Sequence, residues 1–144
     1  MTDALQRPRT LVLFTLAAVL AVVATVAVQL ARGGEPEPAG FGSRTVQAGA
    51  VEVRMTALTL GASGARFRVE LDTHAVALDL DLARAAQLRV NGRLADAGTW
   101  EGTGPGGHHR EGTLRFATAV PVGASLELRI TGLPAEAVAT WVAP

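Results

Sequence analysis

The chain has 144 residues, 49% hydrophobic content and a formal net charge of zero. All thirteen basic residues are arginines, and they are spread along the chain, so the sequence predicts no basic patch for nucleic acid. Cysteine, lysine and tyrosine are absent, which excludes disulfides and removes most of the usual catalytic nucleophiles. We therefore expect a protein that binds a partner rather than an enzyme.

The first predicted element is a membrane anchor. Residues 11–31, LVLFTLAAVLAVVATVAVQLA, carry no charge, and about 20 apolar residues in a helix match the hydrocarbon thickness of a bilayer. The alternative is a cleaved secretory signal, whose apolar region is shorter and ends in a small-x-small site. Thr25-Val26-Ala27 fits such a site only loosely, so the sequence favours an uncleaved transmembrane helix.

Flanking charges predict how this helix is oriented. Arg7 and Arg9 precede it, whereas Arg32 follows it, and basic residues near a span tend to stay on the cytoplasmic side. We expect residues 1–10 in the cytoplasm, a single pass through the cell membrane, and the rest of the chain outside the cytoplasm. The lipid bilayer is then the first predicted partner.

A linker is predicted after the anchor. Residues 32–48 are rich in glycine, proline and glutamate and show no sustained apolar period, which is typical of a flexible or extended segment. The folded domain is expected to cover residues 49–144. A domain of this size buries enough apolar surface to fold without disulfides or metal.

Within the domain, apolar and polar residues alternate with a period of two, the pattern of half-buried strands. The clearest examples are at residues 51–55, 67–71, 88–90, 114–116, 126–130 and 138–142. Asn91-Gly92 predicts a tight hairpin turn, because both central positions of a type I′ turn need positive φ. Helical periodicity is absent apart from one turn at residues 81–86. Together these features predict an all-β, immunoglobulin-like antiparallel β-sandwich preceded by one transmembrane helix.

The segment AVALDLDL, residues 75–82, leaves two topologies open. As a full strand it would place His74 and the loop around His108 and His109 at opposite ends of the sandwich, because hairpin partners run antiparallel. As a bent connection it would place all three histidines at one end.

Three stretches carry a resemblance to a known family. They are FRVELDTHAVALDLDL at 67–82, Trp100-Glu101-Gly102, and GPGGHHREGTLRF at 104–116. The chain resembles a family of bacterial and archaeal membrane-anchored envelope proteins with an LDTHSV-like segment and a GGHHRSG-L-F segment, over about residues 50–142. The resemblance implies an envelope protein and points to no particular activity. Ala75 stands where that family has serine, and the region 94–98 is shortened.

The histidines suggest a metal site. His74, His108 and His109, with Asp72 or Glu101 as a carboxylate ligand, would form a nitrogen-rich set suited to copper or zinc. Adjacent side chains on an extended segment point to opposite faces, however. The alternative is that the histidines form hydrogen bonds that stabilise a long loop between strands.

A second interpretation treats the same loop as a binding surface. Gly106 and Gly107 could present backbone amides beside Arg110 to an anionic partner. Trp100 either packs on the sandwich or forms a wall of this surface next to Glu101. The rival to a metal-binding domain is therefore a structural or protein-interaction module of an envelope complex, without a metal.

Overall fold

The computed structural model describes residues 41–144. The predicted cytoplasmic N-terminus, the anchor and most of the predicted linker lie outside these residues. By its contacts the chain divides into two units, Met1–Glu37 and Pro38–Pro144, and all described residues belong to the second. No helix within residues 41–144 is long and apolar enough to cross a membrane.

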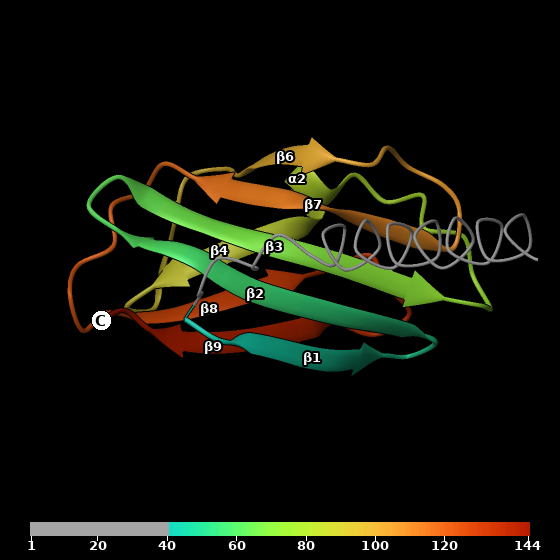
Figure 1. The fold of residues 1–144 in the computed structure, drawn as a ribbon, viewed down its shortest axis with the longest axis horizontal. Helices are drawn as coiled ribbons and strands as arrows, with labels where there is room; N and C mark the ends of the chain where they lie inside the picture. Colours follow the sequence, from blue (N-terminus) through green and yellow to red (C-terminus); the bar gives the residue numbers. More distant parts are fainter. Residues whose placement is uncertain (1–40) are drawn as a thin grey trace, which may run out of the picture. The chain divides into compact units, whose positions relative to one another are not determined.

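The domain is an all-β sandwich of two antiparallel sheets (Figure 1), as predicted. The first sheet has the order β1-β2-β3-β7-β6, formed by Ser43–Ala48, Val51–Gly61, Gly64–Thr73, His109–Phe116 and Thr99–Gly102. The second has the order β5-β4-β8-β9, formed by Arg93–Leu94, Ala86–Val90, Ser125–Ile130 and Ala137–Val142. The short helix α2, Leu82–Ala85, directly precedes β4.

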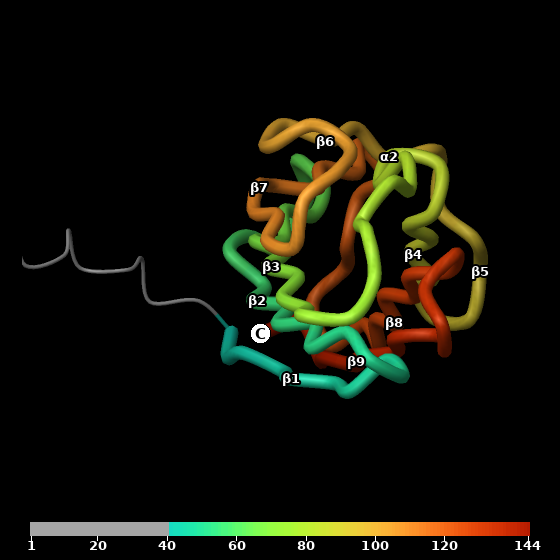
Figure 2. The backbone as a smooth tube through the Cα atoms, turned by 90° about the vertical axis from the view of Figure 1, so that its right-hand side faces the viewer, coloured from blue at the N-terminus to red at the C-terminus, as the bar shows by residue number. Residues whose placement is uncertain are grey.

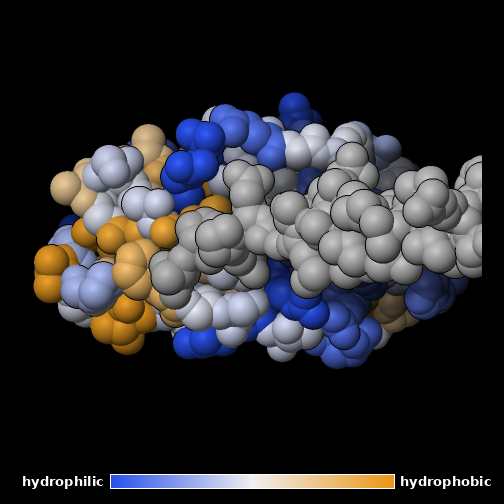
Figure 3. All heavy atoms as spheres, in the orientation of Figure 1, coloured by the Kyte–Doolittle hydropathy of each residue, from blue (hydrophilic) through white to orange (hydrophobic). Residues whose placement is uncertain are grey.

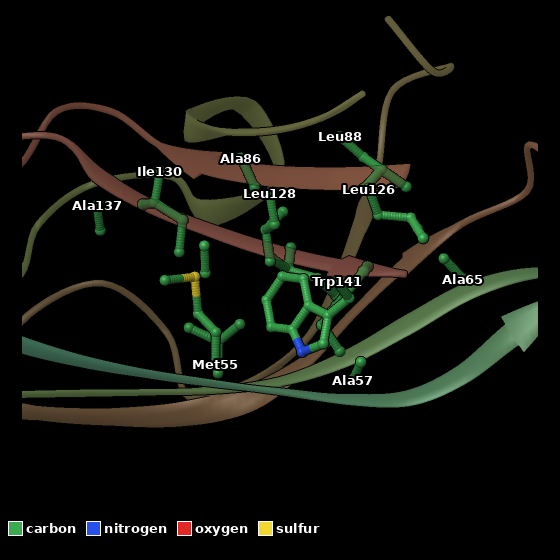
Figure 4. Packing of buried hydrophobic residues seen from close by; sticks show 14 of the residues in the cluster. Met55, Ala57, Ala65, Ala86, Leu88, Leu126, Leu128, Ile130, Ala137 and Trp141 are labelled. Carbon is green, nitrogen blue, oxygen red and sulfur yellow. The ribbon is translucent and has the colours of Figure 1, made fainter. Parts of the chain in front are cut away.

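The core lies between the sheets and follows the alternation in the sequence. Inward-facing residues of β2, β3, β8 and β9 are buried while their neighbours face solvent, as half-buried strands require. Trp141 is buried, its ring centroid is 5.1 Å from that of Phe67, and its indole N–H donates to the carbonyl of Gly42 at 3.0 Å. Figure 4 shows this packing, with Trp141 beside Met55 and Leu128.

Strand β1 occupies residues that the sequence assigns to the linker. It pairs with β2 along its whole length, from Ser43 opposite Thr56 to Ala48 opposite Val51. In β1 only Ala48 is fully buried, because the strand lies at the edge of its sheet. The apolar alternation that reveals the other strands is therefore weak here, and the domain begins earlier than predicted.

The predicted tight turn is confirmed between β4 and β5. Asn91 and Gly92 both have positive φ, 50° and 78°, as this hairpin turn requires. The side-chain oxygen of Asn91 also accepts the backbone N–H of Ser125 at 2.9 Å. The turn is thereby fixed to the start of β8.

Residues 75–82 form a bent connection and not a strand. Figure 2 shows this segment crossing from β3 to α2 over the end of the sandwich, from one sheet to the other. Leu78 is its one fully buried residue up to Asp81. The carboxylate of Asp81 accepts the N–H of Ala83 at 3.0 Å and caps the short helix. The second of the two topologies is therefore correct, and the three histidines share one end.

Charged side chains cover the outer face of the first sheet. Glu70 and Glu111 stand directly opposite each other on β3 and β7, an arrangement of like charges that is destabilising alone. Arg68 lies 3.1 Å from Glu70 and 3.4 Å from Glu111, and Arg54 lies 3.3 Å from Glu70. The two arginines thus neutralise the repulsion between the carboxylates.

Candidate functional site

Two loops lie side by side where β3 ends and β7 begins. Residues 72–81 and 103–109 are joined by three backbone hydrogen bonds: Thr73 N–H to His108 O (2.9 Å), Leu78 N–H to Gly107 O (3.1 Å) and Gly106 N–H to Leu78 O (2.9 Å). We call these two segments the motif end. They contain all three histidines and Asp72, and Arg110 directly follows the second segment.

The buried side chain of Arg110 holds the two loops of the motif end together. Its side chain is 1% exposed. One terminal nitrogen, Nη1, donates to the carbonyls of Leu78 (3.1 Å) and Leu80 (2.6 Å), and Nη2 donates to the carbonyl of Thr103 (3.0 Å). A planar guanidinium with five N–H donors suits such a divergent set of acceptors. A single side chain therefore ties both loops to β7.

The charge of Arg110 is buried without a direct ion pair among the described residues. Burial lowers the pKa of this guanidinium, and the nearby carboxylates of Asp81 and Asp79 raise it. Its Nε has no hydrogen-bond partner within residues 41–144. Arginine keeps its charge in proteins, so the backbone carbonyls supply most of its stabilisation.

Trp100 packs beside this arginine, in space that two glycines leave open. The guanidinium carbon of Arg110 lies 5.8 Å from the centre of the Trp100 ring, and the indole N–H donates to Thr103 O at 3.0 Å. A Cβ on either Gly102 or Gly112 would lie 2.7 Å from Cζ2 of Trp100. Because the two glycines that flank the histidine loop have no side chain, the indole can pack closely against the strands. Trp100 packs against the core cluster, as one of its two predicted roles requires.

His109 forms a close pair with Asp72 on the rim. The two residues stand opposite each other on β7 and β3, and Nδ1 of His109 lies 2.6 Å from Oδ1 of Asp72. This hydrogen bond raises the pKa of His109 above its ordinary value; the charges of Asp72, Glu111 and Glu70 add to the rise, and desolvation opposes it. The arrangement favours an imidazolium held against a carboxylate.

The other two histidines make different contacts. Nδ1 of His108 lies 3.3 Å from the carbonyl of Val76. His74 is exposed, and it directly follows Thr73, whose backbone N–H donates to the carbonyl of His108. Within residues 41–144, no three or more His, Asp or Glu side chains converge closely enough to hold a metal ion. The histidines share one end of the domain without forming a ready coordination shell there.

Glu101 lies apart from the histidines. It is exposed on β6 and forms an ion pair with Arg115 at 2.8 Å. It belongs to the charged outer face of the first sheet.

Sequence reasoning missed the carbonyl acceptors of the motif end. Leu78, Leu80 and Thr103 contribute through their backbones, which no side-chain pattern reveals. The one available signal was the position of Arg110, four and six residues before Leu114 and Phe116, which puts all three side chains on one face if the strand extends back to Arg110. Comparisons with protein-family models, with curated proteins and with solved structures gave no match.

Proposed function

We propose that this protein is a membrane-anchored binding module of the cell envelope, which presents its motif end to a protein partner outside the cytoplasm. The observation that carries the proposal is the buried Arg110, whose guanidinium bonds to three carbonyls in two neighbouring loops. Loops that are ordered before association lose less conformational freedom on binding. Such an arrangement suits a recognition surface better than a reaction centre.

The proposed location depends on the sequence before the domain. Residues 11–31 are apolar and uncharged, and Arg7 and Arg9 lie on their N-terminal side. They support a single-pass anchor with a cytoplasmic N-terminus and an extracytoplasmic domain. The resemblance to envelope proteins agrees with this location.

We also infer that the sandwich is immunoglobulin-like. The order β2-β3-β7-β6 corresponds to strands A-B-E-D of that fold, and β5-β4-β8-β9 corresponds to C′-C-F-G. Strand β1 adds one further edge strand beside β2. Sandwiches of this type commonly bind partners through loops at one end, which fits the role proposed for the motif end.

Site-specific photo-crosslinking in the native envelope would test this function. We would place a photoreactive residue at the exposed Pro105 in the motif end, and another at the exposed Gln87 on the second sheet as the control. We expect one discrete protein adduct from position 105, none of that size from position 87, and loss of the adduct in Arg110→Lys. Adducts that are absent or equal at both positions would contradict the proposal.

A transition metal is the second candidate, and one contact favours it. A histidine that binds a metal through one ring nitrogen commonly donates its other N–H to a carboxylate, as Nδ1 of His109 would do to Asp72. Its Nε2 makes no hydrogen bond to the described part of the chain and is the proposed ligand atom for copper or zinc. His108 and His74 would supply further nitrogens, with Asp72 orienting the imidazole.

Calorimetric titration of copper(II) and zinc into the purified full-length chain would test this candidate. We expect saturable one-site binding that His108→Ala/His109→Ala abolishes and that Asp72→Asn weakens about 10- to 100-fold. Asp96→Asn, at an exposed carboxylate far along the chain, is the matched control and should change nothing. If the wild-type chain takes up neither metal, the candidate fails and the protein-partner proposal still stands.

A further inference from the structure

Exposed apolar side chains gather at the end of the domain opposite the motif end. The large hydrophobic residues that face solvent are Phe41 (38% exposed), Leu94 (60%), Val122 (87%) and Val142 (68%). Figure 3 shows hydrophobic residues concentrated where the C-terminus lies in Figure 1. The segments 41–44, 61–63, 91–98, 117–124 and 142–144 meet there, and we call them the apolar end.

Backbone hydrogen bonds hold these segments together. Val120 donates to the carbonyl of Gly61 at 2.9 Å, and Gly123 donates to that of Ala143 at 3.0 Å. Asp96 N–H donates to the Thr118 hydroxyl at 3.0 Å. The exposed side chains therefore project from one connected surface.

Exposed arginines lie in or near the segments of this apolar surface. Arg44, Arg66, Arg89 and Arg93 are exposed and form no ion pair with any carboxylate of residues 41–144, whereas every other exposed arginine in that range is paired with Asp or Glu. Each of the four lies in, or within three residues of, a segment of the apolar end. Apolar side chains ringed by unpaired cations are typical of surfaces that bind anionic membranes.

A hollow of about 510 Å³ opens between two of these arginines. Arg44 and Arg89 line it, together with the hydroxyl-bearing Ser125 and Thr140. The carboxylate of Glu127 also lines it, and Arg129 pairs with that carboxylate at 3.2 Å. Guanidinium groups bind phosphate through paired hydrogen bonds. The hollow thus offers both charge and hydrogen-bond donors to a phospholipid head group.

The path of the chain brings this end toward the bilayer. The described domain starts at Phe41, whose N–H donates to the carbonyl of Ala57 at 2.9 Å, and β1 runs from there toward the motif end, with Ala48 opposite Val51. Nine residues, 32–40, separate Phe41 from the proposed anchor, and they reach at most about 30 Å when fully extended.

We propose that the apolar end rests on an anionic phospholipid surface, with Val122, Leu94 and Val142 at the boundary of head groups and acyl chains and the four arginines on lipid phosphates. The proposal rests on the anchored location given above. As a consequence, contact with the bilayer orients the domain so that the motif end points toward the partner.

Spin labels on the full-length chain in single-chain lipid nanodiscs would test this proposal. The chain has no cysteine, so Val122→Cys gives a unique label at the apolar end and Ala135→Cys gives the control at an exposed position of the loop between β8 and β9. The discs would hold equal parts of phosphatidylglycerol and phosphatidylcholine, or phosphatidylcholine alone. Collision of the label with oxygen reports lipid, and collision with a water-soluble nickel complex reports solvent.

We expect the label at position 122 to favour oxygen and the label at position 135 to favour nickel in the anionic discs. Arg89→Gln/Arg93→Gln should return the label at position 122 several-fold toward the solvent value, as should phosphatidylcholine alone. A label at position 122 as solvent-accessible as that at position 135 would overturn the proposal. If the label at position 122 is equally buried in both kinds of disc and in Arg89→Gln/Arg93→Gln, the electrostatic part of the proposal is wrong.

Alkaline extraction of native membranes separates this result from a failure of the proposed anchor. A chain that stays in the membrane pellet is anchored, and exposure of the label at position 122 then refutes only the lipid contact of the domain. A chain that alkali releases refutes the anchored location, and the label at position 122 then decides separately whether the domain contacts lipid.

Discussion

The two ends of the sandwich close in different ways. At the apolar end, two-residue turns at 62–63 and 91–92 join β2 to β3 and β4 to β5, and residues 117–124 cross from β7 in the first sheet to β8 in the second. At the motif end, residues 74–81 cross from one sheet to the other beside the long loop 103–108. Backbone hydrogen bonds from Val120 and Gly123 hold the crossing at the apolar end, whereas the crossing at the motif end also has carbonyls that bond to a side chain.

Arg110 supplies that side chain, and this changes how the histidine motif is understood. The arginine resembles an anion-binding residue in the sequence, yet its guanidinium is turned inward onto three carbonyls. The exposed arginines without carboxylate partners lie toward the other end, in segments that carry no motif. A motif rich in reactive side chains can therefore serve mainly to order a loop.

The largest expected effect comes from removing the arginine that orders the motif end. Arg110→Ala removes one donor from each of the carbonyls of Leu78, Leu80 and Thr103 and should lower the free energy of unfolding by about 3 kcal/mol. Urea denaturation would measure it. Arg115→Ala, which breaks an exposed pair with Glu101, should cost less than about 1 kcal/mol. Equal losses would show that the two arginines are equivalent.

A methyl group at the seat of Trp100 should have the next largest effect. In Gly112→Ala the new Cβ would lie 2.7 Å from the indole and 2.5 Å from the carbonyl of Glu101, so we expect a loss of about 1–3 kcal/mol from overpacking. Gly104→Ala is the matched control, because no atom lies within 4 Å of its Cβ. Thermal unfolding of both variants measures the difference. If Gly112→Ala is as stable as the wild-type chain, the glycine is not needed for the packing of Trp100.

The apolar end should respond to backbone geometry instead. Gly92 has a φ of 78° and nothing within 4 Å of its Cβ position, so Gly92→Ala should cost about 1 kcal/mol through conformational strain alone. Urea denaturation is again the measurement. Asn91→Gly, at the neighbouring position of positive φ, keeps the turn accessible and should cost less. A larger loss for Asn91→Gly would mean that the hydrogen bond between Asn91 and Ser125 contributes more stability than the backbone conformation of the turn.

The smallest expected effect is a pH dependence at the motif end. Because the pKa of His109 is raised in the folded protein, chiefly by its hydrogen bond to Asp72, the pair stabilises the fold fully below the unfolded pKa of about 6.5. That stabilisation is lost as pH rises through the folded pKa. Nuclear magnetic resonance titration of the imidazole should give a lower midpoint in Asp72→Asn, and an unchanged midpoint would exclude the pair as the cause.

Much of the fold was predictable from the sequence, because burial on one face imposes a period of two. Strands β2, β3, β8 and β9 follow this pattern, and Asn91-Gly92 fixed a turn by its φ requirement. Strand β1 escaped because an edge strand with one buried residue has little alternation. Residues 75–82 do alternate, but their backbone bonds to a loop and to a side chain rather than to a neighbouring strand.

The candidate site was predictable only in part. The sequence allowed the histidines to share one end, and they do, since Thr73 bonds to His108. It also pointed to Trp100 and Arg110, but their burial depends on three carbonyls that converge only in the folded chain. The pairing of Asp72 with His109 follows from the register of β3 and β7, which the residue pattern does not fix.

Native-state hydrogen exchange of Arg110→Lys tests whether the guanidinium orders the motif end, because lysine keeps the charge and loses the planar set of N–H donors. We predict that the amides of Thr73, Leu78 and Gly106 exchange roughly tenfold faster or more than in the wild-type chain. Those of Val120 and Gly123 at the apolar end should keep their wild-type rates. Equal acceleration at both ends, or none at the motif end, would contradict the claim that Arg110 orders these loops.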